Sequence, residues 1–235
     1  MPAPPLQAVT FDAAGTLIHL TESVGEAYSR VAARFGIHAA PDRLNLAFRT
    51  VWKRTPAPFS GNCPHQGVDD PEKQWWKSLV ETVFAEAGAE PEKVRDRFTE
   101  FFEALYDHFE EPGCWELDEA APAALDHCAK RGLKIGLLSN FDSRLRRILT
   151  DLDIFHRFEH VVLSGEVRAS KPDRKIFEAM QGNLRVSDPE SILHIGDDST
   201  ADIKGAKQAG FRHFHIQKHQ PLAALSLELA KLGTD

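Results

Sequence analysis

Short apolar runs that end in polar residues recur along this chain, and they predict β-strands. The first is "AVTF", which leads directly into Asp12. Apolar runs of this length, bounded by turn-forming residues, are typical of strands that are buried on both faces. Four more such runs lie in the second half of the chain, at residues 133–139, 158–164, 191–197 and 211–217.

Helical spacing of apolar positions separates these later runs. The predicted helices there cover residues 120–130, 143–152, 174–183 and 201–209. Strands that alternate with helices indicate a parallel sheet covered by helices on both faces. The predicted fold class is therefore α/β.

The segment after the first strand has a different pattern, with apolar residues at helical spacing throughout. It predicts helices at 24–35, 41–52, 72–88 and 91–109, and a loop rich in proline and glycine at 53–71. We therefore expect a helical domain at residues 21–111, inserted into an α/β core domain formed by residues 1–20 and 112–235.

Composition changes this picture little. The chain has 42% hydrophobic and 27% charged residues and a net charge of −7, which does not favour a nucleic-acid or membrane partner. No apolar run is long enough to cross a bilayer, and the N-terminal residues do not resemble a secretion signal. We interpret Cys63, Cys114 and Cys128 as reduced packing thiols in a cytoplasmic protein, not as disulfides or a metal cage. The sequence does not define an oligomeric state.

Candidate chemistry gathers at the ends of the predicted strands. Ligands of open parallel sheets bind beyond the carboxyl ends of the strands. The polar residues at or just after these ends are Asp12, Ser139, Asn140, Lys171, Asp197 and Asp198. A carboxylate can act as a nucleophile, further carboxylates can hold Mg²⁺, and a lysine with hydroxyl or amide donors can neutralise a transferring group.

Each of these residues also has an ordinary structural explanation. Asp12 suits a turn with Gly15, and Asp197 and Asp198 suit a helix start. Ser139 and Asn140 suit a helix start in the same way, and a lone lysine is usually solvated. Their common position at one edge of the sheet favours a single pocket suited to phosphoryl transfer.

Four segments resemble the motifs of the haloacid dehalogenase superfamily, in the same order. They are "DAAGTL", "LLSN", "SKP" and "HIGDDSTADIKGAKQAG". The segments "GEAY", "QWW", "CWELD" and "SNFDSRL" resemble more closely the subfamily named haloacid dehalogenase-like hydrolase domain-containing protein 3. The resemblance implies a doubly wound, Rossmann-like core with an inserted helical cap domain.

The same resemblance implies roles for individual residues. Asp12 would be the nucleophile, Ser139 a donor to the transferring group, and Lys171 the charge that orients nucleophile and substrate. It also implies Mg²⁺ held by Asp12, the backbone carbonyl of Ala14, Asp197 and, directly or through water, Asp198. The substrate implied is a small phosphorylated molecule.

Ala14 departs from the superfamily's phosphatases, which have a second aspartate there as general acid and base. Ala14 still offers its carbonyl to a metal, but it cannot transfer a proton. Loss of a positioned acid or base typically costs about 10²–10⁴-fold in rate. The first reading that follows is a weak or specialised hydrolase whose substrate has a good leaving group, or one that borrows an acid such as His19.

Three other readings stay open. The haloacid dehalogenases also lack the second aspartate, but an acid stands here at Asp197 and no tyrosine follows the nucleophile. Phosphonoacetaldehyde hydrolase has alanine at this position and a Schiff-base lysine, for which Lys53 is a candidate. A third possibility is a module that binds a phosphorylated ligand or partner without turnover.

Overall fold

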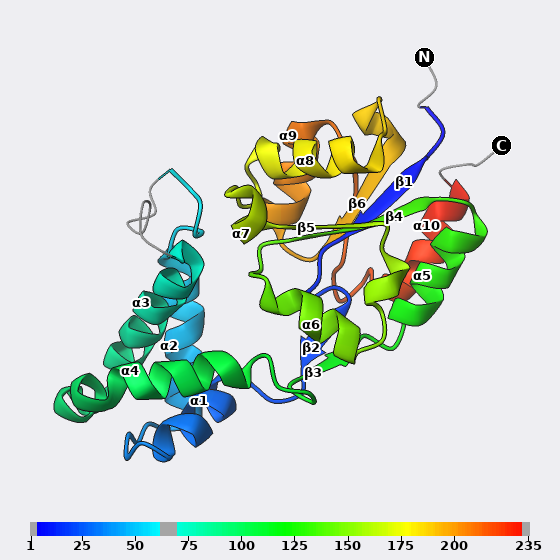
Figure 1. Cartoon of the computed structure of the whole chain (residues 1–235). Helices are drawn as coiled ribbons and strands as arrows, with labels where there is room; N and C mark the ends of the chain where they lie inside the picture. The colour runs from blue at the N-terminus through cyan, green and yellow to red at the C-terminus, as the bar shows by residue number, and fades with distance from the viewer. Residues whose placement is uncertain (1–3, 62–69, 232–235) are drawn as a thin grey trace. The chain divides into compact units, whose positions relative to one another are not determined.

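The computed structural model describes residues 4–61 and 70–231, and the chain divides into two compact units (Figure 1). Unit 1 consists of residues 1–19 and 116–235, and unit 2 of residues 20–115. The boundaries expected from the sequence lay after residues 20 and 111. The structure therefore assigns five further residues, 20 and 112–115, to the helical unit.

A five-stranded parallel sheet forms the centre of unit 1. Its strands are β1 (Ala8–Phe11), β4 (Lys134–Ser139), β5 (His160–Leu163), β6 (Ile192–Gly196) and β7 (Arg212–His215), in the order β5-β4-β1-β6-β7. Each neighbouring pair runs parallel. The predicted parallel sheet is confirmed, and each strand lies within the run that predicted it.

Helices cover both faces of this sheet. Figure 1 shows α8 and α9 on one face and α5 and α10 on the other. The helices of unit 1 are α5 (Ala121–Lys130), α6 (Arg144–Asp151), α7 (Ser164–Val167), α8 (Arg174–Leu184), α9 (Gly205–Ala209) and α10 (Leu225–Lys231), with short 3₁₀ turns at Phe155–Arg157, Pro189–Ser191 and Leu222–Ala224. Fully buried side chains of α8, including Phe177 and Met180, fill the core against the sheet. The doubly wound α/β class is thus confirmed.

The strand order fixes where a ligand site is expected. From β1 the chain continues to β4 and β5 on one side, and then returns to β6 on the other side of β1. The order therefore reverses between β1 and β6. A crevice forms at such a switch point, beyond the carboxyl ends of the two strands.

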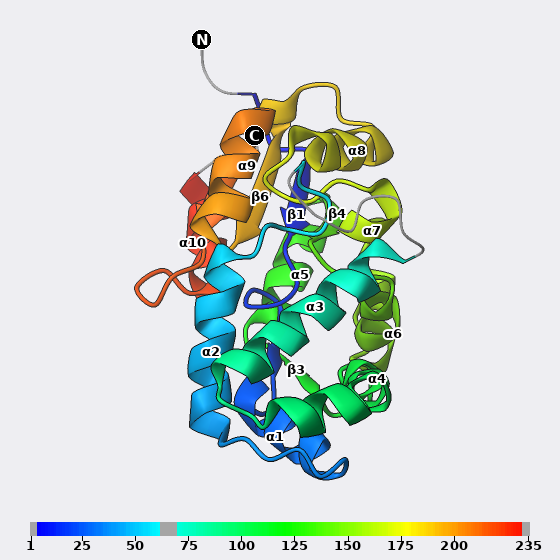
Figure 2. The same cartoon turned by 90° about the vertical axis from the view of Figure 1, so that its left-hand side faces the viewer.

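Unit 2 is helical, as its pattern predicted (Figure 2). Its helices are α1 (Val24–Ala33), α2 (Pro41–Arg54), α3 (Pro71–Glu86) and α4 (Pro91–His108). The last three begin with proline, which fits the first turn of a helix because its missing N–H has no partner to lose there. Aromatic side chains fill the core, where Tyr28 stacks on Phe84 and Phe101 packs edge-on against Phe84.

The chain passes between the units through two short strands, β2 (Ile18–Leu20) and β3 (Trp115–Leu117), which pair with each other. The Thr21 N–H donates to the Cys114 carbonyl at 3.0 Å, and the Asp118 N–H donates to the Leu17 carbonyl at 2.9 Å. Runs of three residues are too short to give a periodic signal, so the sequence did not predict these strands.

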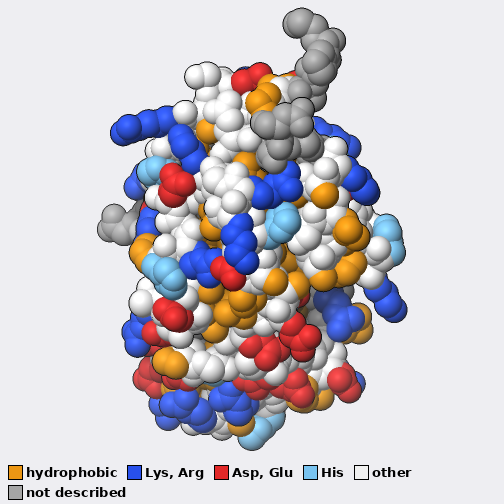
Figure 3. Space-filling view, turned by 90° about the vertical axis from the view of Figure 1, so that its right-hand side faces the viewer, with side chains coloured by type: hydrophobic (Ala, Val, Ile, Leu, Met, Phe, Trp, Pro, Cys, Tyr) orange, Lys and Arg blue, Asp and Glu red, His pale blue; other side chains and the backbone are white. Residues whose placement is uncertain are grey.

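Three further observations complete the description of the fold. Of the predicted loop at 53–71, residues 53 and 54 belong to α2, and residues 62–69 lie outside the described residues. Within the described part of the chain, none of the helices is both long and apolar enough to span a membrane. The face in Figure 3 carries acidic and basic side chains interspersed.

Candidate active site

Asp12 stands at the carboxyl end of the central strand β1. Its N–H donates to the Ile195 carbonyl of β6 at 2.8 Å, which extends the pairing of β1 with β6 by one residue. Asp12 is only 8% exposed. The chain then turns at Gly15, whose φ of +85° is a conformation that glycine adopts without strain. The first strand therefore delivers a nearly buried carboxylate to the switch point of the sheet.

Lys171 bridges Asp12 and a second carboxylate. Its Nζ donates to Asp12 Oδ1 at 2.6 Å, to Asp202 Oδ1 at 2.6 Å and to the Leu138 carbonyl at 2.9 Å. Burial by itself would lower the pKa of Lys171, but Asp12 and Asp202 raise it to about 12. Lys171 is therefore a fixed positive charge beside Asp12 and not a proton carrier near neutral pH.

Asn140 holds the backbone of Lys171 from the end of β4. Its Oδ1 accepts the Lys171 N–H at 2.7 Å, and its Nδ2 donates to the Lys171 carbonyl at 2.9 Å. This pair of hydrogen bonds fixes the lysine main chain, so its side chain reaches Asp12 from a defined point. The sequence predicted Asn140 as a site residue, and the structure gives it a positioning contact.

Asp202 is the site residue that the sequence analysis missed. Besides Lys171, it contacts the fully buried His194, whose Nε2 lies 3.1 Å from Asp202 Oδ1. His194 Nδ1 in turn lies 2.9 Å from Thr10 Oγ1. Although burial would raise the pKa of Asp202, Lys171 and His194 hold it below its ordinary value. The carboxylate is therefore ionised and held by a buried polar network.

A local helix irregularity carries Asp202 to this place. The predicted helix at 201–209 begins instead as a π-helical stretch, η3 (Ser199–Lys204), which α9 continues. The N–H groups of Asp202 and Ile203 both donate to the Asp198 carbonyl. π-Helical turns occur frequently at functional sites. The spacing of Asp202 five residues after Asp197, on the helix that leaves β6, was the available signal.

Asp198 caps this stretch. Its Oδ1 accepts the N–H groups of Thr200 and Ala201, both at 2.7 Å, and its own N–H donates to Asp202 Oδ2 at 3.0 Å. These bonds are those of a helix N-cap, the structural role that the sequence also allowed. The carboxylates that lie close together at this edge of the sheet are those of Asp12, Asp197 and Asp202. The metal-binding role predicted for Asp198 stays a prediction.

Asp197 follows β6 and completes that group. The residue is exposed, but its carboxylate lies against Gly15, where an added Cβ would be 2.6 Å from Asp197 Oδ2. Partial burial of the charge, with the nearby carboxylates of Asp12 and Asp202, raises the pKa of Asp197 to about 6. Burial likewise raises the pKa of Asp12, although Lys171 opposes the shift.

These three carboxylates form a group that suits a hard cation. One oxygen each from Asp12, Asp197 and Asp202 lies within 4.8 Å of the others. All the donors are carboxylate oxygens, which is the ligand type that Mg²⁺ prefers. Lys171 balances part of their charge. Burial first, and neighbouring carboxylates second, raise the pKa values of Asp12 and Asp197, and a nearby cation would oppose both shifts. The residues present therefore fit the cation expected from the sequence.

The remaining predicted residues lie as follows. Ser139 is buried at the end of β4, the strand that pairs with β1. Ala14 is half-buried in the turn after Asp12 and forms a bridge with Ile18. His19 Nε2 lies 3.1 Å from Asp118 Oδ2, and none of its contacts among the described residues reaches Asp12. Lys53 belongs to unit 2. The roles predicted for Ser139 and for the Ala14 carbonyl stay predictions.

The sequence matches the family model of the haloacid dehalogenase-like hydrolases over residues 6–210. Among curated proteins, it is 34% identical over 220 residues to the haloacid dehalogenase-like hydrolase domain-containing protein 3 of Mus musculus, covering 92% of this chain and 84% of the mouse protein. It is 31% identical over 214 residues to the Rhythmically expressed gene 2 protein of Drosophila melanogaster, covering 86% and 80%.

Solved structures share the fold at lower identity. A protein of Haemophilus somnus described as a predicted phosphoglycolate phosphatase superposes with a TM-score of 0.68 at 19% identity, covering 96% of this chain and 98% of the other. The HAD-hydrolase YfnB of Bacillus subtilis, whose structure is described as bound to magnesium, gives 0.66 at 19% identity, covering 91% and 89%. Together with the four motifs and the family-model match, these similarities confirm the resemblance found in the sequence: the chain belongs to the haloacid dehalogenase-like hydrolase family.

Proposed function

We propose that this hydrolase acts on a small phosphorylated molecule through an aspartyl-phosphate on Asp12, with Mg²⁺ as cofactor. The observation that carries the proposal is the contact of Lys171 Nζ with Asp12 Oδ1 at 2.6 Å, in a group that also includes Asp197 and Asp202. A buried carboxylate oriented by a fixed ammonium and surrounded by further acids has the parts of a phosphoryl-transfer site.

The proposed reaction has two steps. A carboxylate oxygen of Asp12 attacks phosphorus, the bond from phosphorus to the leaving oxygen breaks, and that oxygen departs with the electron pair. Water then attacks the phosphorus of the aspartyl-phosphate, which returns the Asp12 carboxylate and releases inorganic phosphate. Lys171 orients Asp12, favours its ionised form against the effect of burial, and neutralises charge on the transferring group.

Asp12, Asp197 and Asp202 would hold Mg²⁺, and the cation would supply positive charge to the transferring phosphoryl group. Asn140 contributes by fixing the Lys171 backbone. Asp202 is kept in place by a buried network of contacts that runs through His194 to Thr10.

Ala14 leaves this site without a general acid or base at that position. Its methyl side chain gives no proton to a leaving oxygen and takes none from the attacking water. We therefore propose that turnover is low for alkyl phosphates, whose leaving groups need protonation, and higher for acyl or aryl phosphates. The alternative function, a module that binds a phosphorylated ligand without turnover, follows from the same Ala14.

The test is phosphate release from acetyl phosphate, p-nitrophenyl phosphate and a panel of phosphorylated metabolites, with and without Mg²⁺. We expect Mg²⁺-dependent release that Asp12→Asn abolishes. Release that Asp12→Asn leaves unchanged would remove Asp12 from the mechanism. Phosphate-ester binding without release, in the wild type, would instead favour the binding module.

A further inference from the structure

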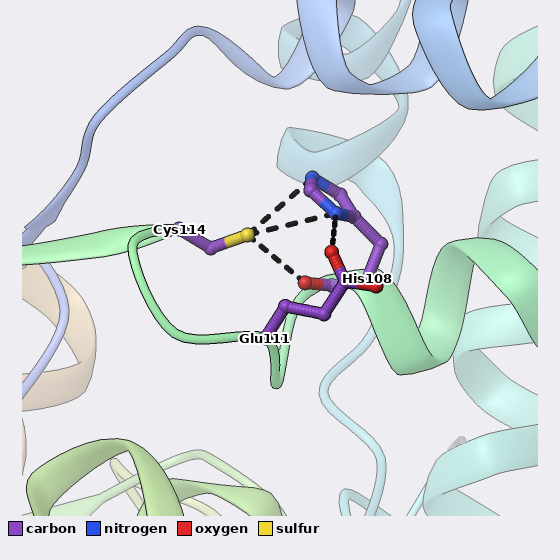
Figure 4. Close-up of side chains that lie close together, drawn as sticks. All are labelled: His108, Glu111 and Cys114. Carbon is purple, nitrogen blue, oxygen red and sulfur yellow. Dashed lines mark hydrogen bonds and ion pairs between the residues drawn. The ribbon is translucent and has the colours of Figure 1, made fainter. Parts of the chain in front are cut away.

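A second group of metal-ligand side chains lies in unit 2, at the end of α4 (Figure 4). It consists of His108, Glu111 and Cys114. His108 Nδ1 lies 2.9 Å from Glu111 Oε2 and 3.6 Å from Cys114 Sγ. One ligand atom from each residue lies within 4.8 Å of the other two. This group is separate in the chain from the carboxylates of unit 1 and does not depend on the function proposed for them.

The local fold explains why these side chains converge. Helix α4 ends at His108, and the chain then folds into a tight turn in which the Glu111 N–H donates to the His108 carbonyl at 3.0 Å. The Cys114 N–H donates to the Glu111 carbonyl at 3.3 Å. A spacing of three residues in successive turns places all three side chains on one side. The Thr21 backbone pairs with Cys114 and fixes the end of the turn.

Burial distinguishes this group from a solvated charge cluster. His108 is 6% exposed and Cys114 is 7% exposed, whereas Glu111 is exposed. A nitrogen and a sulfur atom that can bind a metal are thus held inside the unit. The carboxylate of Glu111 lies at the surface, where an ion from solvent can reach it. Burial and the nearby Glu111 and Glu22 raise the pKa of the Cys114 thiol. A raised pKa argues against a reactive thiolate, and a bound cation is what would ionise this thiol.

The other imidazole nitrogen lies beside a carboxylate that could accept its proton. His108 Nε2 lies 3.3 Å from Glu22 Oε1, and Arg30 forms an ion pair with Glu22. When Nδ1 is a ligand, Nε2 carries the ring proton and donates it to Glu22, which is the carboxylate–histidine–metal arrangement of many zinc sites.

The contact between Arg30 and His108 would change when a metal ion binds. One of its nitrogens lies 3.0 Å from His108 Nε2, a contact in which the guanidinium donates to an unprotonated nitrogen. Metal binding at Nδ1 places the proton on Nε2, so Arg30 must turn fully towards Glu22. Its side chain is about half exposed and has the room to do so.

We propose that His108 Nδ1, the Glu111 carboxylate and the Cys114 thiolate bind Zn²⁺, with water in the fourth position. Nitrogen, sulfur and oxygen donors suit Zn²⁺, whereas the all-carboxylate group of unit 1 suits Mg²⁺. Binding releases the thiol proton of Cys114 and moves the ring proton of His108 to Nε2. The ion joins the end of α4 to the residue that precedes β3, and so stabilises unit 2.

The test is a titration of the full chain with Co²⁺, followed by displacement with Zn²⁺. A cysteine ligand gives a thiolate-to-cobalt charge-transfer band, which an all-oxygen site does not produce. We expect this band to appear, to saturate at one equivalent and to disappear on addition of Zn²⁺ but not of Mg²⁺. We also expect Zn²⁺ to raise the melting temperature. Absence of the band from the wild-type chain would overturn the proposal.

Matched variants identify the ligands. Cys114→Ser should abolish the band, whereas Cys128→Ser should retain it, because Cys128 is a buried free cysteine outside the group. Cys63→Ser controls for the remaining cysteine, which lies outside the described residues. A band that persists in Cys114→Ser would overturn the assignment.

A second pair of variants keeps the test decisive if Cys114→Ser does not fold. Glu111 is exposed, so Glu111→Gln should fold and should weaken Co²⁺ and Zn²⁺ binding strongly. Glu22→Gln should weaken it by about 10–100-fold, the usual effect of losing the acceptor behind a histidine ligand. Unchanged affinity in Glu111→Gln would overturn the proposal.

Discussion

The ammonium nitrogen of Lys171 lies 2.6 Å from Asp12 Oδ1, although the two residues are 159 positions apart in the sequence. The same nitrogen lies 2.6 Å from Asp202 Oδ1. Lys171 and the two aspartates are all almost completely buried. The parallel sheet therefore brings one positive and two negative side chains from three segments into a single buried contact, and the following predictions depend on it.

Lys171 should be essential for both stability and activity. Lys171→Met leaves Asp12 and Asp202 facing each other without a counter-charge, and breaking a buried ion pair in this way costs about 3–5 kcal/mol. We expect a large fall in the free energy of unfolding, measured by urea denaturation, and loss of phosphate release. Lys175→Met, an exposed lysine four residues later, is the control and should behave as wild type. Equal stability of the two variants would contradict the buried contact.

Ala14→Asp should increase phosphatase turnover. The substitution restores a carboxyl group that can protonate the leaving oxygen and activate water, and such groups typically contribute about 10²–10⁴-fold. The measurement is kcat/KM, and the gain should be larger for an alkyl phosphate than for acetyl phosphate. Ala14→Asn has similar size without an acid and should give no gain. Equal rates for the two variants would show that the missing acid does not limit this site.

Mg²⁺ affinity should fall as the pH decreases through about 6. Burial and the carboxylates of Asp12 and Asp202 raise the pKa of Asp197 to that value in the metal-free chain, and the cation requires the ionised form. Calorimetric titration between about pH 5 and pH 8 measures the effect. An affinity that does not change over this range would separate Asp197 from the metal.

The raised pKa of Asp197 also predicts how the stability of the metal-free chain depends on pH. Because the folded pKa of Asp197 lies above the unfolded value, its contribution to stability is present at low pH and is lost as the pH rises through about 6. Asp197→Asn carries no charge at any pH, so its melting temperature should exceed that of the wild type above about pH 6 and approach it below about pH 4. A lower melting temperature of the variant at high pH would contradict the assignment.

Gly15→Ala should remove the response to Mg²⁺. Gly15 has a φ of +85°, and an added Cβ would lie 2.6 Å from Asp197 Oδ2, so the carboxylate must move. Gly132→Ala is the matched control, since Gly132 has a φ of +68° but no atom within 4 Å of the added Cβ. Both variants should lose about 1–2 kcal/mol from backbone strain. Only Gly15→Ala should lose Mg²⁺-dependent stabilisation in a thermal melt; retention of it would contradict the close approach of Asp197.

Much of unit 1 was predictable because buried strands give continuous apolar runs. Asp12 could be found in this way because it stands at the end of such a run, and Lys171 because it follows the run at 158–164 and precedes a helix; parallel strands end at one edge. Asp202 was missed because it follows the strand end by several residues, and the π-helical stretch that turns it towards Lys171 has no periodic signature. The short strands β2 and β3 likewise depend on pairing between distant segments, which local sequence does not encode.

In unit 2, the sequence predicted the four helices from their apolar spacing but not the group around His108. Cys114 was interpreted as a packing thiol because it is widely separated from the other cysteines. Its neighbours in the fold are the histidine that ends α4 and a glutamate of the following turn, at a three-residue spacing that is common without any metal. Only the tertiary structure shows that two of the three ligands are buried.

The most direct test of the central claim is chemical trapping of the intermediate. With acetyl phosphate, the first step needs no acid, whereas the second lacks a base at Ala14, so aspartyl-phosphate should accumulate. Borohydride reduction of the quenched reaction converts an aspartyl-phosphate to homoserine, which peptide mass spectrometry locates. We predict homoserine at position 12 in the wild-type chain. Phosphate release without modification of Asp12, or with modification of another carboxylate, would contradict the account.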